Sequence, residues 1–422
     1  MDKEILKEVV FDNHEIIKNF KIVQRNYDFY LNANYVLVGL RRAGKSTLLF
    51  KIIQDLVAGG IDWNQIIYIN FEDERLEEFS ARDFNDILTL QSELSDKKGW
   101  FFFDEIQNIE GWEKFARRMA DSKEHTFITG SNAKMLSGEI EKKLGGRYLS
   151  KYITPYSFDE FLKAKNIDFS EKSLAGTKSR GLIKRAFEEY FYFGGFPENL
   201  LYSDKRGYVS SIYQKVLLGD IASRNGIRNS NGLKLLMKKI AETTKDEVSY
   251  SKLHNILKSI GVSISKDVVI DYIGYAKESY LIFAVKNYFS KFVDKETTPK
   301  YYWNDNGLLN LFLHKEDTRL LENLVAVTLK NRYEEIYYLK SSKLDADFFV
   351  PENGIVVQTA FSLSVISDDR ETKALLQAAK NLEEAKRFII ITYDEEKTLE
   401  LDGVKIEVIP VWKWLLMEKK ST

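Results

Sequence analysis

Residues 39–47 read Gly39-Leu40-Arg41-Arg42-Ala43-Gly44-Lys45-Ser46-Thr47. This stretch matches the pattern G-x-x-x-x-G-K-[ST], follows an apolar run at residues 35–38 and precedes a helical pattern at residues 45–57. Glycines let the backbone wrap closely around phosphates with its N–H groups pointing inward. The helix that follows turns its positive dipole end toward the same anion. We interpret the stretch as a phosphate-binding loop, because an ordinary glycine turn does not account for Lys45 and Ser46.

A second stretch, residues 100–105, reads Trp-Phe-Phe-Phe-Asp-Glu. An apolar strand that ends in two carboxylates is typical of a Walker B segment, whereas an Asp-Glu pair alone is usually a solvated turn. In this interpretation Lys45 holds the β- and γ-phosphates, and Ser46 and Asp104 bind Mg²⁺. Glu105 activates the attacking water as general base. The predicted ligands are ATP and Mg²⁺; the lack of an Asn-Lys-x-Asp motif favours ATP over GTP.

Two further positions are candidates for catalysis. The run at residues 127–132 is expected to form a strand beside the strand of the phosphate-binding loop, which makes Ser131 or Asn132 a candidate to orient water. Arg147, in Gly145-Gly146-Arg147-Tyr148, is the best candidate to stabilise developing phosphate charge, on its own chain or on a neighbour. For each, a plain turn or surface residue is the alternative.

Composition narrows the class of protein. The 422 residues suggest two to four domains, and 62 Lys+Arg against 63 Asp+Glu exclude an overall polycationic nucleic-acid binder. Without cysteine there can be no disulfide or Cys-ligated zinc, and the four histidines are scattered. The first twenty residues carry charges throughout, and no run approaches the ~18 apolar residues that span a bilayer. We expect a cytoplasmic protein without membrane contact.

The pattern of apolar runs changes along the chain. Up to about residue 155, short apolar runs alternate with helical patterns, which indicates a parallel sheet covered on both faces. Residues 157–218 are expected to be mainly helical. Between 232 and 288 we expect three helices, with Ser249 and Ser265 as caps, and a hairpin or wing formed by residues 280–285 and 288–292. The remaining residues alternate again between strand and helix.

Several motifs together resemble a known family. GLRRAGKST, FFFDEIQNIEGWE, ITGSNAKMLS, GGRYLSKYITPYSFDEFL and YFYFGGFPE occur here in one order. The series resembles bacterial and archaeal AAA-type ATPases whose C-terminal half is a domain of unknown function. The resemblance implies an α/β fold with four parts: a P-loop core with its lead-in at 1–155, a helical lid at 156–228, a winged-helix-like segment at 229–295, and a restriction-endonuclease-like α/β domain at 296–422.

That last domain raises the alternative of a Mg²⁺-dependent nuclease. Such sites use a helix carboxylate, a strand Asp and then Glu/Gln-x-Lys on the next strand. Glu322, Asp347 and Gln358 fit the first three positions, but Ala360 stands where the lysine is needed. Lys340 or Lys343 could replace that lysine only if the fold brought it close. We therefore expect an inactive domain.

The charge of the winged-helix-like segment is unusual for this chain. Residues 224–266 contain nine basic and only three acidic residues. Such an excess suits contact with a DNA backbone, although a solvated face on a protein-binding module is an equal alternative. The sequence thus favours an ATP-driven switch or motor on DNA or a protein partner. A DNA-binding scaffold with ATP as a structural ligand is the second reading, and homo-oligomerisation stays open.

Overall fold

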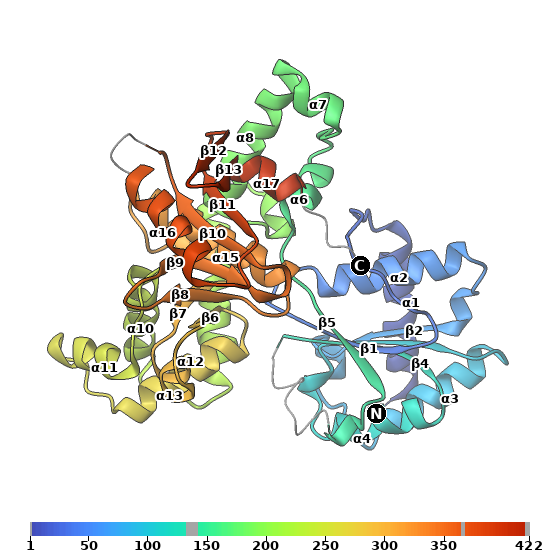
Figure 1. Cartoon of the computed structure of the whole chain (residues 1–422). Helices are drawn as coiled ribbons and strands as arrows, with labels where there is room; N and C mark the ends of the chain where they lie inside the picture. Colours follow the sequence, from blue (N-terminus) through green and yellow to red (C-terminus); the bar gives the residue numbers. More distant parts are fainter. Residues whose placement is uncertain (1, 132–141, 364–367, 418–422) are drawn as a thin grey trace. The chain divides into compact units, whose positions relative to one another are not determined.

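The computed structural model describes residues 2–131, 142–363 and 368–417. The chain divides into two compact units, Met1–Thr154 with Glu278–Tyr280 and Pro155–Lys277 with Leu281–Thr422 (Figure 1). The predicted α/β class is confirmed, with a parallel sheet in the first unit and a mixed sheet in the second. The predicted four-part division is finer than these units and stays a prediction. No described helix is both long enough and apolar enough to cross a bilayer.

The first unit is built around a five-stranded sheet in the order β2-β3-β4-β1-β5, with every neighbouring pair parallel. The phosphate-loop strand β1 lies between β4 and β5, so the predicted neighbour relation with residues 127–130 is confirmed. Its elements are α1 (Lys3–Asn19), β1 (Asn34–Val38), α2 (Lys45–Ala58), η1 (Trp63–Gln65), β2 (Ile66–Asn70), η2 (Glu74–Leu76), α3 (Phe84–Leu94), β3 (Trp100–Asp104), η3 (Ile106–Asn108), α4 (Trp112–Asp121), β4 (His125–Gly130) and β5 (Tyr148–Tyr152).

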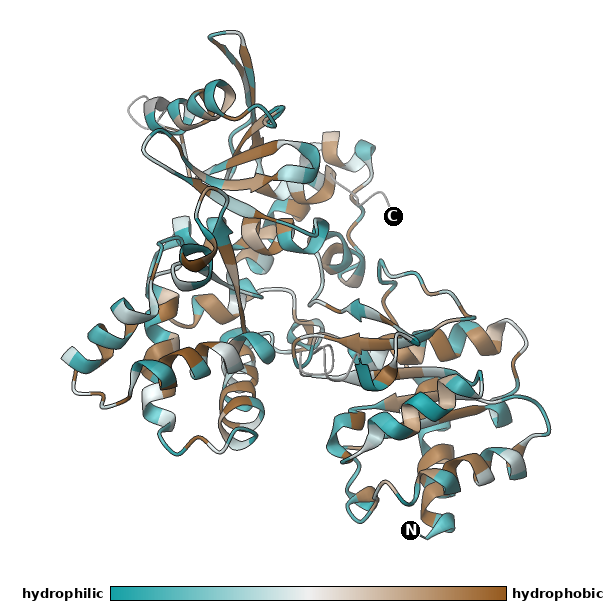
Figure 2. Cartoon of the chain, turned by 60° about the horizontal axis from the view of Figure 1, so that its bottom comes forward, coloured by the Kyte–Doolittle hydropathy of each residue, from teal (hydrophilic) through white to brown (hydrophobic). Residues whose placement is uncertain are grey.

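Helices cover both faces of this sheet because its central strands are apolar on both sides. Phe102 points into a core that includes Leu49 and Ile53 of α2. Its neighbour Phe103 points the opposite way and packs against Phe115 of α4, with ring centroids 5.6 Å apart. Much of the length of the central strands is accordingly brown in Figure 2. Because both faces of the sheet are buried, its polar side chains are found mainly at the ends of the strands. The candidate nucleotide-binding residues lie at these ends.

The second unit begins with helices and ends in an eight-stranded sheet. Its elements are α6 (Phe158–Ala164), α7 (Glu171–Ala175), α8 (Thr177–Phe193), η5 (Pro197–Leu201), α9 (Lys205–Gln214), the π-helix η6 (Lys215–Ser223), α10 (Ser230–Glu242), α11 (Tyr250–Ser259), α12 (Lys266–Glu278), β6 (Ile282–Asn287), α13 (Phe292–Thr297), β7 (Lys300–Trp303), α14 (Asn306–Asn310), α15 (Asp317–Arg332), β8 (Tyr337–Lys340), β9 (Asp345–Val350), η7 (Pro351–Asn353), β10 (Ile355–Ala360), α16 (Asp368–Asn381), β11 (Arg387–Thr392), β12 (Lys397–Leu401), β13 (Val404–Pro410) and α17 (Val411–Met417).

The predicted wing is wrong in its second strand. Residues 288–292 form no strand; β6 instead pairs antiparallel with β7 and, on its other side, parallel with β8. The sheet therefore runs β12-β13-β11-β10-β9-β8-β6-β7, and the hairpin belongs to the C-terminal sheet. The predicted caps are confirmed, since Ser249 accepts the Lys252 N–H and Ser265 accepts the Val268 N–H, each at 3.2 Å. Local signals fixed the helices, whereas strand pairing depended on distant partners.

The motif Gly194-Gly195-Phe196-Pro197 has an architectural role. Gly194 has φ +75°, and a Cβ added there would lie within 2 Å of the Asp305 carboxylate. A Cβ on Gly195 would lie 2.2 Å from the Tyr156 carbonyl oxygen. Asp305 accepts the N–H groups of Gly195 and Gly307, each at 2.8 Å. The motif thus joins the end of α8 to the start of α14 through a close backbone approach that only glycine permits.

Candidate nucleotide-binding site

The loop between β1 and α2 takes a shape that needs its glycines. Gly39 has φ +149°, and a Cβ there would lie 2.0 Å from the Ile153 carbonyl oxygen. Gly44 precedes the first residue of α2 with φ +95°, in the left-handed region. Both positions strongly favour a residue without a Cβ. The predicted strand–loop–helix context of residues 39–47 is thereby present.

Lys45 is folded back against its own loop. Its Nζ donates to the carbonyl oxygens of Gly39 at 3.2 Å and Leu40 at 3.3 Å, and the residue is 4% exposed. The same Nζ lies 3.8 Å from Glu105 Oε1. The loop therefore holds a buried ammonium group between its own backbone and the Walker B carboxylate.

Asp104, at the end of β3, is the most heavily hydrogen-bonded group of the site. It accepts hydrogen bonds from the hydroxyls of Tyr68, at 2.8 Å, and Thr129. Burial raises the pKa of Asp104, and the adjacent Glu105 charge raises that pKa further. Hydrogen bonds from three hydroxyls, including that of Ser46, lower it. The structure thus brings the two predicted metal ligands, Ser46 and Asp104, into contact.

Glu105 follows Asp104 in a strained conformation. Its φ of 51° lies in the left-handed region, which a glutamate rarely adopts. The conformation is held because the Glu105 N–H donates to Thr129 Oγ1 at 3.0 Å and the Gln107 amide donates to the Glu105 carboxylate. In this conformation the Glu105 carboxylate lies 3.8 Å from the Lys45 ammonium.

Ser131 and Asn132 were the candidates at the end of β4. Ser131 is 1% exposed, and within the described ranges its hydroxyl has no hydrogen-bond partner. Buried polar atoms nearly always have a partner, so this hydroxyl is suited to a ligand or water. Asn132 lies outside the described residues. The role of Ser131 stays a prediction.

Arg147 does not lie beside the phosphate loop of its own chain. It directly precedes β5, and Tyr148 of that strand pairs with Asn34, the first residue of β1. The phosphate loop follows the opposite end of β1, about five residues or ~16 Å away. Arg147 instead pairs with Asp121 and donates to the Gly145 carbonyl oxygen at 3.2 Å. Arg147 thus lies at the opposite end of β1 from the phosphate loop, and its action on its own chain or on a neighbouring copy stays a prediction.

Sequence reasoning missed the arginine that braces the loop. Arg25 is 6% exposed, and its guanidinium donates to the carbonyl oxygens of Ala43 at 2.9 Å and Thr154 at 2.7 Å. Tyr27 adds a hydroxyl that accepts the Thr154 N–H at 3.0 Å. Both residues belong to the segment that follows α1, which carries no motif. Only the fold brings this segment against the loop, so no local signal could have identified it.

The alternative nuclease residues lie near one another in the second unit. Asp347 Oδ2 accepts from the Thr359 N–H at 2.8 Å, and the Asp347 N–H donates to Gln358 Oε1 at 3.0 Å. Burial, and then the charge of Asp347, raise the pKa of Glu322 to about 8. At neutral pH this raised pKa favours the protonated form of Glu322.

Neither Lys340 nor Lys343 takes the place of the lysine that the nuclease pattern requires. Lys340 pairs with Glu247 at 2.9 Å, and Lys343 is exposed. Lys300 of β7 is the lysine that approaches Glu322, at 3.7 Å. Over the described ranges, no three His, Asp or Glu side chains form a group that could hold a metal ion. Lys340 and Lys343 therefore do not fill the lysine position of the pattern, and the inactivity of this domain stays a prediction.

The basic segment at residues 224–266 is partly neutralised. Arg224 lies 3.5 Å from Asp220, and Lys239 lies 3.0 Å from Glu242. Lys252 and Lys258 are exposed on α11, and within the described part of the chain neither has an ion pair. Positive charge is thus exposed on this segment, but it is distributed over α10, α11 and the start of α12.

Comparison with known proteins agrees with this architecture. Residues 32–162 match the AAA domain, and residues 184–319 match a domain of unknown function, DUF8612. MJ1544, an uncharacterized protein of Methanocaldococcus jannaschii, is 35% identical over 432 residues, which cover 99% of this chain and 96% of that protein. An uncharacterized protein of Haemophilus influenzae is 32% identical over 389 residues, which cover 90% and 94%.

Solved structures show more distant similarity. The Walker-type ATPase of Pyrococcus abyssi aligns over 72% of this chain and 95% of its own, with 15% identity and a TM-score of 0.42. The ORC1 protein of Aeropyrum pernix, solved in complex with DNA, aligns over 77% and 93%, with 13% identity and a TM-score of 0.28.

The parallel sheet, the phosphate loop and the AAA match define an AAA-class P-loop protein. More particularly, the chain belongs to the family of the M. jannaschii protein MJ1544, to which it is similar over nearly its whole length.

Replacing Arg25 by Met is expected to lower the free energy of unfolding by about 2–3 kcal/mol, because two charge-assisted hydrogen bonds to buried carbonyl groups are lost. ATP affinity should fall together with stability, because the phosphate loop loses its hydrogen bond from Arg25 to the Ala43 carbonyl oxygen. Urea unfolding and calorimetric titration measure the two effects. Lys21→Met, at an exposed position of the same segment, is the control. Equal behaviour of the two variants would show that Arg25 does not support the loop.

Glu322→Gln tests the protonation of the buried carboxyl group. The folded pKa of about 8 exceeds the unfolded value of about 4.3, so the folded chain holds an extra proton between these pH values. Stability from this group is complete below about pH 4 and is lost as pH rises through 8. The melting temperature of the wild type should therefore fall relative to Glu322→Gln between pH 5 and 8.5. Glu352→Gln, on the surface, should show no such trend; a pH-independent gap for Glu322→Gln would contradict the assignment.

Proposed function

We propose that this protein binds MgATP at residues 39–47 and hydrolyses it, with Lys45 on the β- and γ-phosphates and Glu105 as general base. The observation that carries the proposal is the convergence of Lys45, Ser46, Asp104 and Glu105 at one edge of the sheet. Lys45 and Glu105 are 3.8 Å apart, and Ser46 hydrogen-bonds Asp104. Four groups from two separate stretches of the chain thus meet, as expected for a phosphate loop beside a Walker B strand.

The residues at this edge suit Mg²⁺. A hydroxyl and a carboxylate are oxygen ligands of the kind Mg²⁺ prefers, and one or two protein oxygens are usual for Mg²⁺ bound with phosphates. Burial disfavours the charged form of Asp104, so a cation nearby would favour it. A bound Mg²⁺ would neutralise developing phosphate charge. Ser46 and Asp104 would hold the ion, and Ser131 would hydrogen-bond a phosphate oxygen or water.

Gln107, which the sequence analysis did not identify, positions the carboxylate of Glu105. Its amide nitrogen donates to the Glu105 carboxylate, while its Oε1 is buried and, among residues of the described ranges, unpartnered. Lys45 approaches the other oxygen of the same carboxylate. When Lys45 turns to phosphates, Glu105 loses one of its two partners and is freer to accept a proton from water. Gln107 thus serves as a positioning residue for the base.

We propose that ATP binding and hydrolysis drive a switch or motor that acts on DNA or on a protein partner. The exposed lysines of residues 224–266 support DNA contact, and the second reading, a DNA-binding scaffold with ATP as a structural ligand, uses the same lysines. The distance of Arg147 from its own loop supports a role for it on a neighbouring copy in a homo-oligomer. The nuclease alternative is disfavoured by Ala360, which stands where the pattern needs a lysine.

Lys45→Ala and Glu105→Gln separate binding from hydrolysis. Lys45→Ala should weaken ATP binding at least ~100-fold, because the phosphates lose their buried cation. Glu105→Gln should bind ATP but lower kcat by about 10²–10⁴-fold, because the amide cannot accept a proton. Calorimetric titration and phosphate release measure the two steps. Lys51→Ala, which changes a lysine of α2 that pairs with Asp55, is the control. Normal turnover by either site variant would remove the assigned role.

DNA contact is tested by titrating labelled duplex at several salt concentrations, with and without ATP. If the lysines neutralise phosphates, log K should fall linearly with log salt, and Lys252→Glu with Lys258→Glu should reduce the slope by about two. Measuring ATPase activity with and without DNA in the same samples separates a switch from a scaffold. No salt-sensitive binding in either condition would eliminate nucleic acid from both readings.

A further inference from the structure

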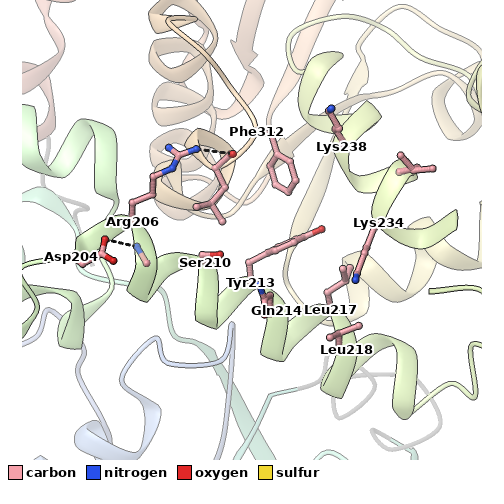
Figure 3. A pocket seen from close by; sticks show the side chains of 13 residues that line it. Asp204, Arg206, Ser210, Tyr213, Gln214, Leu217, Leu218, Lys234, Lys238 and Phe312 are labelled. Carbon is pink, nitrogen blue, oxygen red and sulfur yellow. Dashed lines mark hydrogen bonds between the residues drawn. The ribbon is translucent and has the colours of Figure 1, made fainter. Parts of the chain in front are cut away.

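A hollow in the second unit lies apart from the candidate nucleotide site, and two lysines of the basic segment line it. Its volume is about 740 Å³, and it is walled by α9, η6, α10 and the residues after α14 (Figure 3). Its lining includes Tyr213, Leu217, Leu218, Lys234, Lys238 and Phe312. All of these belong to one compact unit, so the hollow does not depend on how the two units are arranged.

One wall has an unusual backbone. The α-helix α9 passes at Lys215 into a π-helix of nine residues, and Leu217 and Leu218 of that π-helix line the hollow. π-Helices are rare, and where they occur they are frequently at functional sites. The wider helical turn presents Leu218 at the rim, where it is 41% exposed. An exposed leucine at the edge of a hollow is available to a partner.

The floor is apolar, and its aromatic rings are already packed. Tyr213 meets Phe312 edge-on, with ring centroids 5.1 Å apart at 84°. Phe312 in turn packs against the buried ring of Trp303 at 5.0 Å. Rings held in this way give a rigid surface for an aliphatic or aromatic side chain. They offer poor platforms for stacked bases, because the cluster uses their faces and edges.

The rim is cationic. Lys234 and Lys238 lie one turn apart on α10, both are exposed, and within the described part of the chain neither has an ion-pair partner. Arg206 is occupied with the carbonyl oxygens of Asn310 and Leu311, each at 2.9 Å. The only acid in the lining, Asp204, caps α9 by accepting the Gly207 N–H at 2.8 Å. Two lysines are therefore left to attract an anionic ligand.

We propose that this hollow binds a polypeptide segment in which a bulky apolar side chain is flanked by carboxylates. The apolar side chain fills the floor between Leu217 and Phe312, and the carboxylates pair with Lys234 and Lys238. This division of labour, with an apolar anchor in a pocket and charges at the rim, is the usual one for peptide docking. A DNA duplex is convex and presents phosphates without an apolar anchor, so it would leave the leucine-lined floor unfilled.

The experiment uses the full chain and a phage-displayed library of random 12-residue peptides. Peptides are selected on the wild type after removal of those that bind Lys234→Glu with Lys238→Glu. The enriched peptides should combine Asp or Glu with Leu, Phe or another bulky apolar residue. A synthetic enriched peptide, labelled with fluorescein, is then titrated by fluorescence anisotropy.

The variants distinguish this site from general charge attraction. Lys234→Glu with Lys238→Glu, and separately Leu218→Asp, should each weaken peptide binding at least ~10-fold. Lys252→Glu with Lys258→Glu makes the same charge change outside the hollow and should leave binding within about twofold. Each variant must retain the wild-type melting temperature. Leu218→Asp, a surface change that leaves the lysines intact, tests the apolar anchor by itself.

Three results would overturn the proposal: no enrichment over the counter-selected variant, enrichment of basic peptides, or equal loss of binding in the Lys252/Lys258 control. Displacement of the peptide by duplex or single-stranded DNA, with loss of DNA binding in Leu218→Asp, would assign the hollow to nucleic acid instead. The proposal does not rest on ATP hydrolysis, because Lys45→Ala should bind the peptide normally even if it loses ATP.

Discussion

The buried carboxylate of Asp104 is the constraint on which the nucleotide site depends. Burial makes its charge costly, and hydroxyl groups from α2, β2 and β4 converge to stabilise it. Thr129 has a double part, since its hydroxyl donates to Asp104 and accepts the N–H of the strained Glu105. One threonine on a neighbouring strand thus fixes both acids. A change in strand order would separate these groups, which is why the site requires this sheet.

The phosphate loop is supported by Arg25 and by the residues that follow β5. Gly39 permits the close approach of Ile153, and Arg25 ties the Ala43 carbonyl to the end of β5. Lys45 is meanwhile satisfied by backbone carbonyls, so the buried ammonium has partners without a phosphate. The loop is therefore preformed, and nucleotide binding would exchange partners rather than fold the loop. Preorganisation of this kind lowers the entropy lost on binding.

Polar groups of the second unit fall into two sets. Some are buried and hold the fold together, and others are exposed lysines. Asp305 and the glycine pair at 194–195 hold two helices together through backbone contacts, and Glu322 is kept among Tyr302, Lys300 and Asp347. The lysines at the hollow and on α11 stand apart from these networks. Among the described residues these lysines have no ion-pair partner, which makes them the better candidates for interaction.

The sequence by itself determined most of the elements and predicted the local chemistry of the candidate nucleotide site. The pattern of 39–47, the apolar run before Asp104 and the serine caps are local signals, because each depends on residues a few positions apart. Only the tertiary structure decided strand partners and everything they bring together. It paired β6 with β7 rather than with residues 288–292, set Arg147 at the far edge of the sheet, and brought Arg25 and Gln107 against the site. These contacts join residues that are distant in the chain, or they depend on the direction of a side chain. Both are set by which residues are buried together, and burial is a property of the whole fold.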